Sequence, residues 1–154
     1  MSSDTNVPET NISEPNLQEA EIMGMKPNTY CMLLHLSQIL NFCAMPCGII
    51  VPIVLWILNK NQSPQVDLHG KIILNWQISL FVYMVACVMI TVTGFIFSIF
   101  MAVATGIPLR FGVILAFPVG FVLGILALVF PIIGALKANE GTVWKYPLSI
   151  QFFK

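Results

Sequence analysis

Long apolar stretches without charge alternate with short polar segments along this chain. No Asp, Glu, Lys or Arg occurs at 27–59, at 72–109 or at 111–136. An apolar stretch of about 18 residues or more is long enough to cross the hydrocarbon core of a bilayer. The pattern predicts an all-α integral membrane protein that consists of a bundle of about four membrane helices.

Proline divides the first apolar stretch into two short helices. The first is predicted at 28–44, because the residue before Pro46 is unlikely to be helical, and the second at 48–59. At 1.5 Å per residue they reach about 25 Å and 18 Å, which is less than the bilayer core of about 30 Å. Two short spans and a re-entrant hairpin both fit these lengths.

A long third helix is predicted from 64 to 105, and its length of about 60 Å is twice the thickness of the bilayer core. Asp67 and Lys71 lie near its start. Each would cost about 2.5–3.5 kcal/mol at the bilayer centre. Residues 64–76 are therefore expected to lie at the membrane surface, and residues 77–104 to cross it.

The remaining boundaries follow from composition. After a turn at 104–108, a fourth helix is predicted at 109–137. Residues 1–27 are acidic, polar and free of aromatic residues, which predicts a disordered tail. The helical membrane domain is placed at 28–139, and the aromatic and basic segment 140–154 is expected at the interface between lipid and water.

Small residues recur every fourth position in the third and fourth helices. In one antiparallel register the two rows face each other pair by pair, since each pair of residue numbers has the same sum. Close backbone approach over small residues stabilises helix pairs in lipid, so a small-residue-packed hairpin is predicted. Alternatively, one row contacts a second copy or another membrane protein. The residues are Gly94, Ser98, Ala102, Gly106, Gly112, Ala116, Gly120 and Gly124.

Polar residues at membrane depth follow faces of the first and third helices. Polar groups in hydrocarbon need partners, or each costs several kcal/mol. Mutual hydrogen bonds that lock the first helix onto the third are predicted, and a polar cavity open to the cytoplasm is the alternative. The polar set is His35, Gln38, Asn41, Asn75, Gln77 and Ser79.

The sequence predicts no enzyme. It contains no H-E-x-x-H, no G-x-S-x-G and no phosphate-binding glycine loop. The four cysteines have no local histidine or carboxylate that completes a metal-ligand set. No catalytic residue, cofactor or metal is therefore expected, and the zero net charge gives no indication of nucleic-acid binding.

Three blocks carry a family resemblance: MLLHLSQIL (32–40), QSPQVDLHGKIILNWQISLFVY (62–83) and ALVFPIIGALKANEGTVWKYPLSIQF (127–152). Together they resemble the Tic-twenty-like family of small bacterial four-helix membrane proteins, relatives of a subunit of the chloroplast inner-envelope protein translocon. The matching residues that gather at the predicted cytoplasmic rim are Asp67, His69, Gly70, Lys71, Lys137, Asn139, Glu140 and Tyr146.

The resemblance implies a multi-pass protein of the bacterial inner membrane. Lysines gather on the side that holds both termini, so both are expected in the cytoplasm. The predicted function is that of a non-enzymatic accessory or scaffold protein that associates with other membrane proteins, in protein translocation or assembly. Its expected partners are membrane lipids and another membrane protein or a second copy. A small channel or transporter subunit and a lipid-binding protein are the alternatives. Gly70 is expected to allow close approach of the 137–146 segment.

Overall fold

The computed structural model describes residues 21–106 and 111–154, with the side chains of 111–116 excepted. In this part of the chain the regular structure is helical apart from one isolated β-bridge between Ile22 and Met25. The predicted all-helical fold with two long apolar helices is confirmed. The elements are α1 (Pro27–Leu36), the 3-10 helix η1 (Ser37–Ile39), α2 (Leu40–Cys43), α3 (Cys47–Asn59), α4 (Pro64–Thr105) and α5 (Phe111–Asn139).

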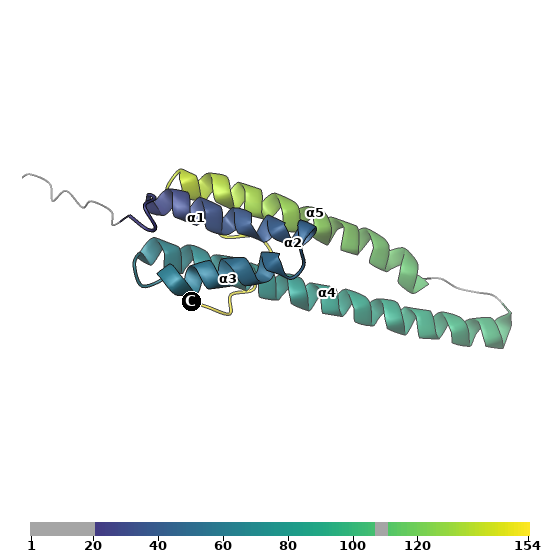
Figure 1. Ribbon diagram of the computed structural model, residues 1–154. Helices are drawn as coiled ribbons and strands as arrows, with labels where there is room; N and C mark the ends of the chain where they lie inside the picture. The colour runs from purple at the N-terminus through teal and green to yellow at the C-terminus, as the bar shows by residue number, and fades with distance from the viewer. Residues whose placement is uncertain (1–20, 107–110) are drawn as a thin grey trace, which may run out of the picture.

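The 42-residue helix α4 has the bounds that the sequence predicts. Ser63 has an extended backbone, and Pro64 follows as the first helical residue, where its missing N–H costs least. Gly106 ends the helix in the left-handed conformation at φ 74°, and its N–H donates to the carbonyl of Ala102. At 1.5 Å per residue α4 is about 63 Å long, and it runs as one continuous helix (Figure 1).

The first three helical segments form a hairpin that lies against the two long helices. α1, η1 and α2 run in one direction, and α3 returns after the turn at 44–46. α1 packs on α5 and α4, and α3 packs on α4 (Figure 1). The 13 residues of α3 reach about 20 Å, less than a bilayer core.

Burial divides the molecule into a base and two arms. We call the base the part where α1, η1, α2, α3, residues 64–80 of α4, residues 126–139 of α5 and the C-terminal segment 140–154 pack together. The arms are residues 81–105 of α4 and 111–125 of α5, which extend beyond the base (Figure 1). No residue of the α4 arm is buried, although the arm is almost entirely apolar. Both α4 and the 117–139 part of α5 are long and apolar enough to cross a membrane.

The start of α4 belongs to the base. Its inner face is covered by α1, α3 and the C-terminal segment, which bury its inward-facing residues. The buried residues are Val66, His69, Gly70, Ile72, Ile73, Leu74, Asn75, Trp76 and Ser79. The position of residues 64–76 at the membrane surface stays a prediction.

The folded part begins before the boundary at residue 27 that the acidic tail suggested. Residues 22–25 form a turn, and Ile22 is fully buried against Tyr30, Cys31 and Val66. An isoleucine removed completely from solvent contributes about 1.5–3 kcal/mol to folding. Ile22, together with the partly buried Met25, therefore attaches this segment to the base.

The predicted close contact between the two rows of small residues does not form at Gly120 and Gly124. A Cβ atom added at either glycine would meet no atom within 4 Å. In the base, Trp76 of α4 contacts Phe130 of α5 with ring centroids 4.9 Å apart, so large aromatic side chains rather than small residues fill the space between the helices there. The side chains of Gly112 and Ala116 lie outside the described residues.

A different glycine prediction also requires correction. Gly70 does not receive the 137–146 segment but the indole of Trp56, which an added Cβ would overlap. Trp56 comes from α3, so Gly70 sets the distance between α3 and α4.

We predict that Gly70→Ala lowers the free energy of unfolding by about 1–3 kcal/mol, because the new methyl group overlaps the Trp56 ring. Gly120→Ala is the matched control, since it makes the same change in a helix with open space around it. Thermal unfolding in detergent measures both. A Gly70→Ala variant as stable as Gly120→Ala would show that Trp56 does not pack tightly on α4.

Candidate functional site

A chain of buried polar side chains crosses the centre of the base. His35 of α1 is fully buried, and its Nδ1 lies 2.5 Å from the Tyr146 hydroxyl while its Nε2 lies 2.8 Å from His69 Nδ1. Gln38 Nε2 also contacts the Tyr146 hydroxyl, at 3.0 Å. These four side chains, which we call the histidine–tyrosine chain, connect α1, η1, α4 and the C-terminal segment.

The donors of the histidine–tyrosine chain can be assigned from its ends. Burial, and secondarily the neighbouring His69, lowers the pKa of His35, so its ring is neutral. Burial raises the pKa of Tyr146, which keeps its proton. Because the Gln38 amide can only donate at this nitrogen, the Tyr146 O–H is free to donate to His35 Nδ1. His35 then carries its proton on Nε2 and donates it to His69.

Gly134 of α5 makes room for this arrangement. A Cβ added there would lie 2.8 Å from His35 Nδ1 and 2.9 Å from the Tyr146 hydroxyl oxygen. Both distances are shorter than a side chain tolerates. Any larger residue at this position would force the His35–Tyr146 pair apart.

Aromatic rings enclose the outer side of the chain. Tyr146 contacts Trp76 with ring centroids 5.8 Å apart, Phe130 at 5.8 Å and Trp144 at 5.3 Å. Such contacts contribute about 0.5–1.5 kcal/mol beyond the area that they bury. The rings exclude water from the hydrogen bonds, which strengthens them.

The C-terminal segment is fastened along α4 by backbone hydrogen bonds. Asn75 Oδ1 accepts from the N–H groups of Phe152 at 3.0 Å and Phe153 at 2.8 Å, and its Nδ2 donates to the Phe153 carbonyl at 2.9 Å. Ser79 Oγ accepts from the N–H of Ile150 at 2.8 Å. The side chains of α4 thus replace the partner strand or helix that the extended segment lacks.

The predicted polar set is therefore brought together only in part. His35, Gln38, Asn75 and Ser79 are buried and hydrogen-bonded. Within the described residues, one side-chain hydrogen bond joins α1 to α4, between His35 and His69. The other long-range partners of these four side chains lie in the C-terminal segment. Sequence reasoning missed this segment as a partner. Its signal was the uncharged run of apolar residues between Lys145 and Lys154.

The two other members of the polar set differ from these four. Gln77 Nε2 donates to the Gly48 carbonyl at 2.9 Å. Gln77 Oε1 and Asn41 Oδ1 are buried amide oxygens without a hydrogen-bond partner among the described residues. Both oxygens are hydrogen-bond acceptors that have no donor among the described residues.

The predicted rim residues divide into two groups. His69, Gly70 and Tyr146 are buried inside the base, whereas four charged residues form ion pairs at its surface. Asp67 forms an i,i+4 ion pair with Lys71 at 2.7 Å and also accepts from Trp56 Nε1 at 3.1 Å. Lys137 forms an exposed ion pair with Glu140 at 2.8 Å, directly beyond Asn139, where α5 ends. Exposed pairs of this kind contribute about 0–1 kcal/mol.

A groove of about 390 Å³ opens where the arms leave the base. Gly120, Leu123 and Gly124 of α5 line one side, and the unpartnered oxygens of Asn41 and Gln77 belong to residues of its polar end. We call it the arm groove. Its lining residues are Gln38, Asn41, Phe42, Met45, Gly48, Ile49, Trp76, Gln77, Leu80, Phe81, Met84, Gly120, Leu123, Gly124 and Ala127.

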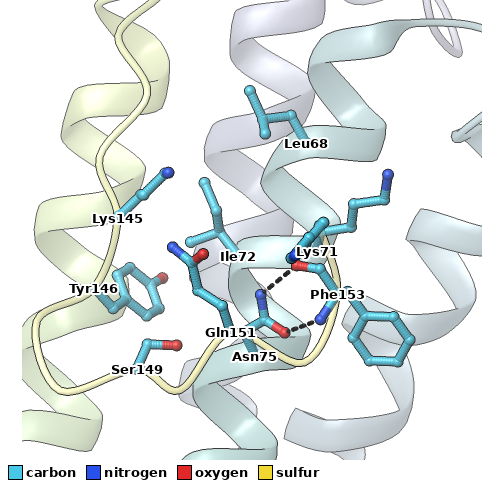
Figure 2. Close-up of a pocket in the computed structure, with 10 residues that line it drawn as sticks. Leu68, Lys71, Ile72, Asn75, Lys145, Tyr146, Ser149, Gln151 and Phe153 are labelled. Atoms are coloured by element: carbon cyan, nitrogen blue, oxygen red, sulfur yellow. Dashed lines mark hydrogen bonds between the residues drawn. The ribbon is translucent and has the colours of Figure 1, made fainter.

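A second cavity of about 270 Å³ lies between α4 and the C-terminal segment, and we call it the base pocket. Figure 2 shows Leu68, Lys71 and Ile72 on α4 opposite Lys145 and Gln151 on the C-terminal segment. Lys154 also lines it. Within the described residues no group of three or more His, Cys, Asp or Glu side chains could hold a metal ion.

The fold and the site define an all-helical protein with two apolar helices of membrane-spanning length and a hydrogen-bonded polar base. The chain belongs to the MamF/MmsF family, the magnetosome magnetite crystal formation protein family, whose family model matches residues 26–153. The expected membership of the Tic-twenty-like family is wrong, because these are different families. No curated protein and no solved structure matches the chain significantly.

We predict that Tyr146→Phe lowers the free energy of unfolding by about 1–3 kcal/mol, because it leaves His35 Nδ1 without a partner and removes one of the two hydrogen bonds of the Gln38 amide nitrogen. Tyr83→Phe is the control. It removes one exposed hydrogen bond, which the Tyr83 hydroxyl donates to the carbonyl of Leu148 in the C-terminal segment. Thermal unfolding in detergent compares the two. Equal losses would mean that the histidine–tyrosine chain is no more important than a surface contact.

Proposed function

We propose that this protein is a non-enzymatic accessory protein of the magnetosome membrane that takes part in magnetite crystal formation by binding the transmembrane helix of another membrane protein. Membership of the magnetosome magnetite crystal formation family supports the process. The arm groove supports the mode of action, and it is the observation on which the proposal rests.

The α4 arm and the apolar part of α5 are the parts proposed to cross the membrane. The 25 residues from 81 to 105 reach about 38 Å, enough for a bilayer core of about 30 Å. Their side chains are largely apolar and exposed, as the lipid-facing surface of a membrane helix must be. The base carries the lysines at 60, 71, 137, 145 and 154, which favours its placement on the cytoplasmic side.

The arm groove has the chemistry that a helix needs for docking in lipid. Gly120 and Gly124 have open space above them, so a helix backbone can approach closely. Gln38, Asn41 and Gln77 line one part of the groove and provide polar groups for serine, threonine or similar side chains on that helix. The row of small residues that does not close the α4–α5 pair is thus available to a partner.

A channel is less well supported by the polar residues. His35, Asn75 and Ser79 are 0%, 5% and 0% exposed, and each is hydrogen-bonded within the protein. A water-filled path would have to break these contacts. We therefore propose that these side chains support the base, which holds the arms in place.

We predict that a photo-crosslinking amino acid at Gly124 links the protein to a membrane protein in native magnetosome membranes. The same amino acid at Ala86 is the control, because Ala86 is exposed on the α4 arm but does not line the groove. Mass spectrometry identifies the adduct. A link to a second copy would assign the groove to self-association and contradict docking of a different protein, and equal linking at both positions would contradict a specific groove.

Crystal size tests the biological part of the proposal. We expect loss of the gene to change the size of the magnetite crystals measured by electron microscopy, and wild-type protein to restore it. Gly124→Leu fills the groove and should restore size poorly, whereas Ala86→Leu should restore it fully, at equal amounts of protein in the membrane. Normal crystals without the gene would contradict a role in crystal formation.

A further inference from the structure

We propose that the base pocket binds the phosphate group of an anionic phospholipid from the leaflet that surrounds the base. The ligand chemistry is a phosphate ester next to apolar groups. The site is separate from the arm groove, and the proposal does not depend on the partner helix or on magnetite.

The pocket is positively charged. Lys71, Lys145 and Lys154 line it, and within the described residues only Lys71 has a carboxylate partner, Asp67. The ammonium groups of Lys145 and Lys154 are thus available to an added anion. Lysine ammonium groups donate up to three hydrogen bonds each, and such charge-assisted bonds to phosphate oxygens are the strong ones.

The wall that carries two of these lysines is held in place before any ligand binds. The hydrogen bonds of Asn75 to Phe153, which Figure 2 shows, fix the C-terminal segment along α4. The bonds of Asn75 to Phe152 and of Ser79 to Ile150 add to them. Buried Tyr146 anchors the segment just beyond Lys145. A preformed site avoids the entropy cost of ordering a loop on binding.

The remaining lining explains why a lipid fits better than a soluble phosphate. Leu68, Ile72 and Phe153 provide apolar walls beside the lysines. Lys71 is the last charged residue before the uncharged stretch 72–109, about three helical turns before the α4 arm begins. Basic pockets on the cytoplasmic side of membrane helices bind anionic headgroups. Gln151 and Ser149 add uncharged polar groups for the ester oxygens.

The test is lipid binding to the purified full-length protein in mild detergent, followed by native mass spectrometry. Phosphatidylglycerol is expected to bind, and phosphatidylcholine at the same concentration is expected to bind much more weakly. Lys145→Gln with Lys154→Gln should weaken phosphatidylglycerol binding about tenfold or more. Lys60→Gln with Lys137→Gln is the control, because it removes the same charge from the base outside the pocket.

A second variant adds charge instead of removing it. Gln151→Glu places a carboxylate in the pocket and should also weaken binding, whereas Gln62→Glu, in the exposed loop before α4, should not. Circular dichroism and thermal unfolding confirm that each variant is folded. If both double lysine variants lose phosphatidylglycerol binding equally, the lipid is attracted by the surface charge in general and the proposed pocket is wrong. Equal binding of phosphatidylglycerol and phosphatidylcholine would lead to the same conclusion.

Competition with inorganic phosphate distinguishes a site for a lipid phosphate from a site for a free phosphate ion. Inorganic phosphate in excess should leave bound phosphatidylglycerol in place, because it cannot use the apolar walls. If inorganic phosphate displaces phosphatidylglycerol completely, the proposed lipid ligand is wrong and the pocket is a site for a soluble anion. None of these measurements uses a partner protein or crystals, so failure here is distinguishable from failure of the proposed function.

Discussion

The hydrogen bond between His35 and Tyr146 is the contact on which the base depends. It joins two residues that are 111 positions apart, and both are almost completely buried. A buried polar group without a partner costs several kcal/mol, so neither side chain can leave the pair unless the surrounding helices separate. The C-terminal segment, η1 and the start of α4 all meet at this pair through Gln38 and His69. The space for it is provided by Gly134.

The sequence predicted the helices well because their ends are determined locally. Pro64 begins α4 and Gly106 ends it, and each acts through its own backbone geometry. The position of the C-terminal segment could not be predicted in the same way. Its contacts with Asn75 and Ser79 join residues more than 70 positions apart, and no periodicity in the segment indicates which surface it covers. The polar residues on α4 were visible, but their partners were not.

The rows of small residues show a different limit of structure prediction from sequence. A row of residues four apart indicates that one face of a helix is small, but it does not indicate what approaches that face. In the base, Trp76 and Phe130 fill the space between α4 and α5, and the glycines at 120 and 124 stay open. The mistaken family resemblance has a related cause. Its three blocks at 32–40, 62–83 and 127–152 lie largely in the base. Residues that maintain a fold are weak indicators of function.

The two proposed binding sites share α4, and this gives the base a mechanical role. Lys71 and Asn75 line the base pocket, while Trp76, Leu80 and Met84 line the arm groove within the next turns of the same helix. A shift or rotation of this part of α4 would alter both linings together. Trp76 also packs on Tyr146, so such a movement would disturb the buried histidine–tyrosine chain. Because that chain is costly to break, the base resists the movement. The polar core therefore keeps the proposed headgroup site and the proposed helix-docking groove at fixed positions relative to each other.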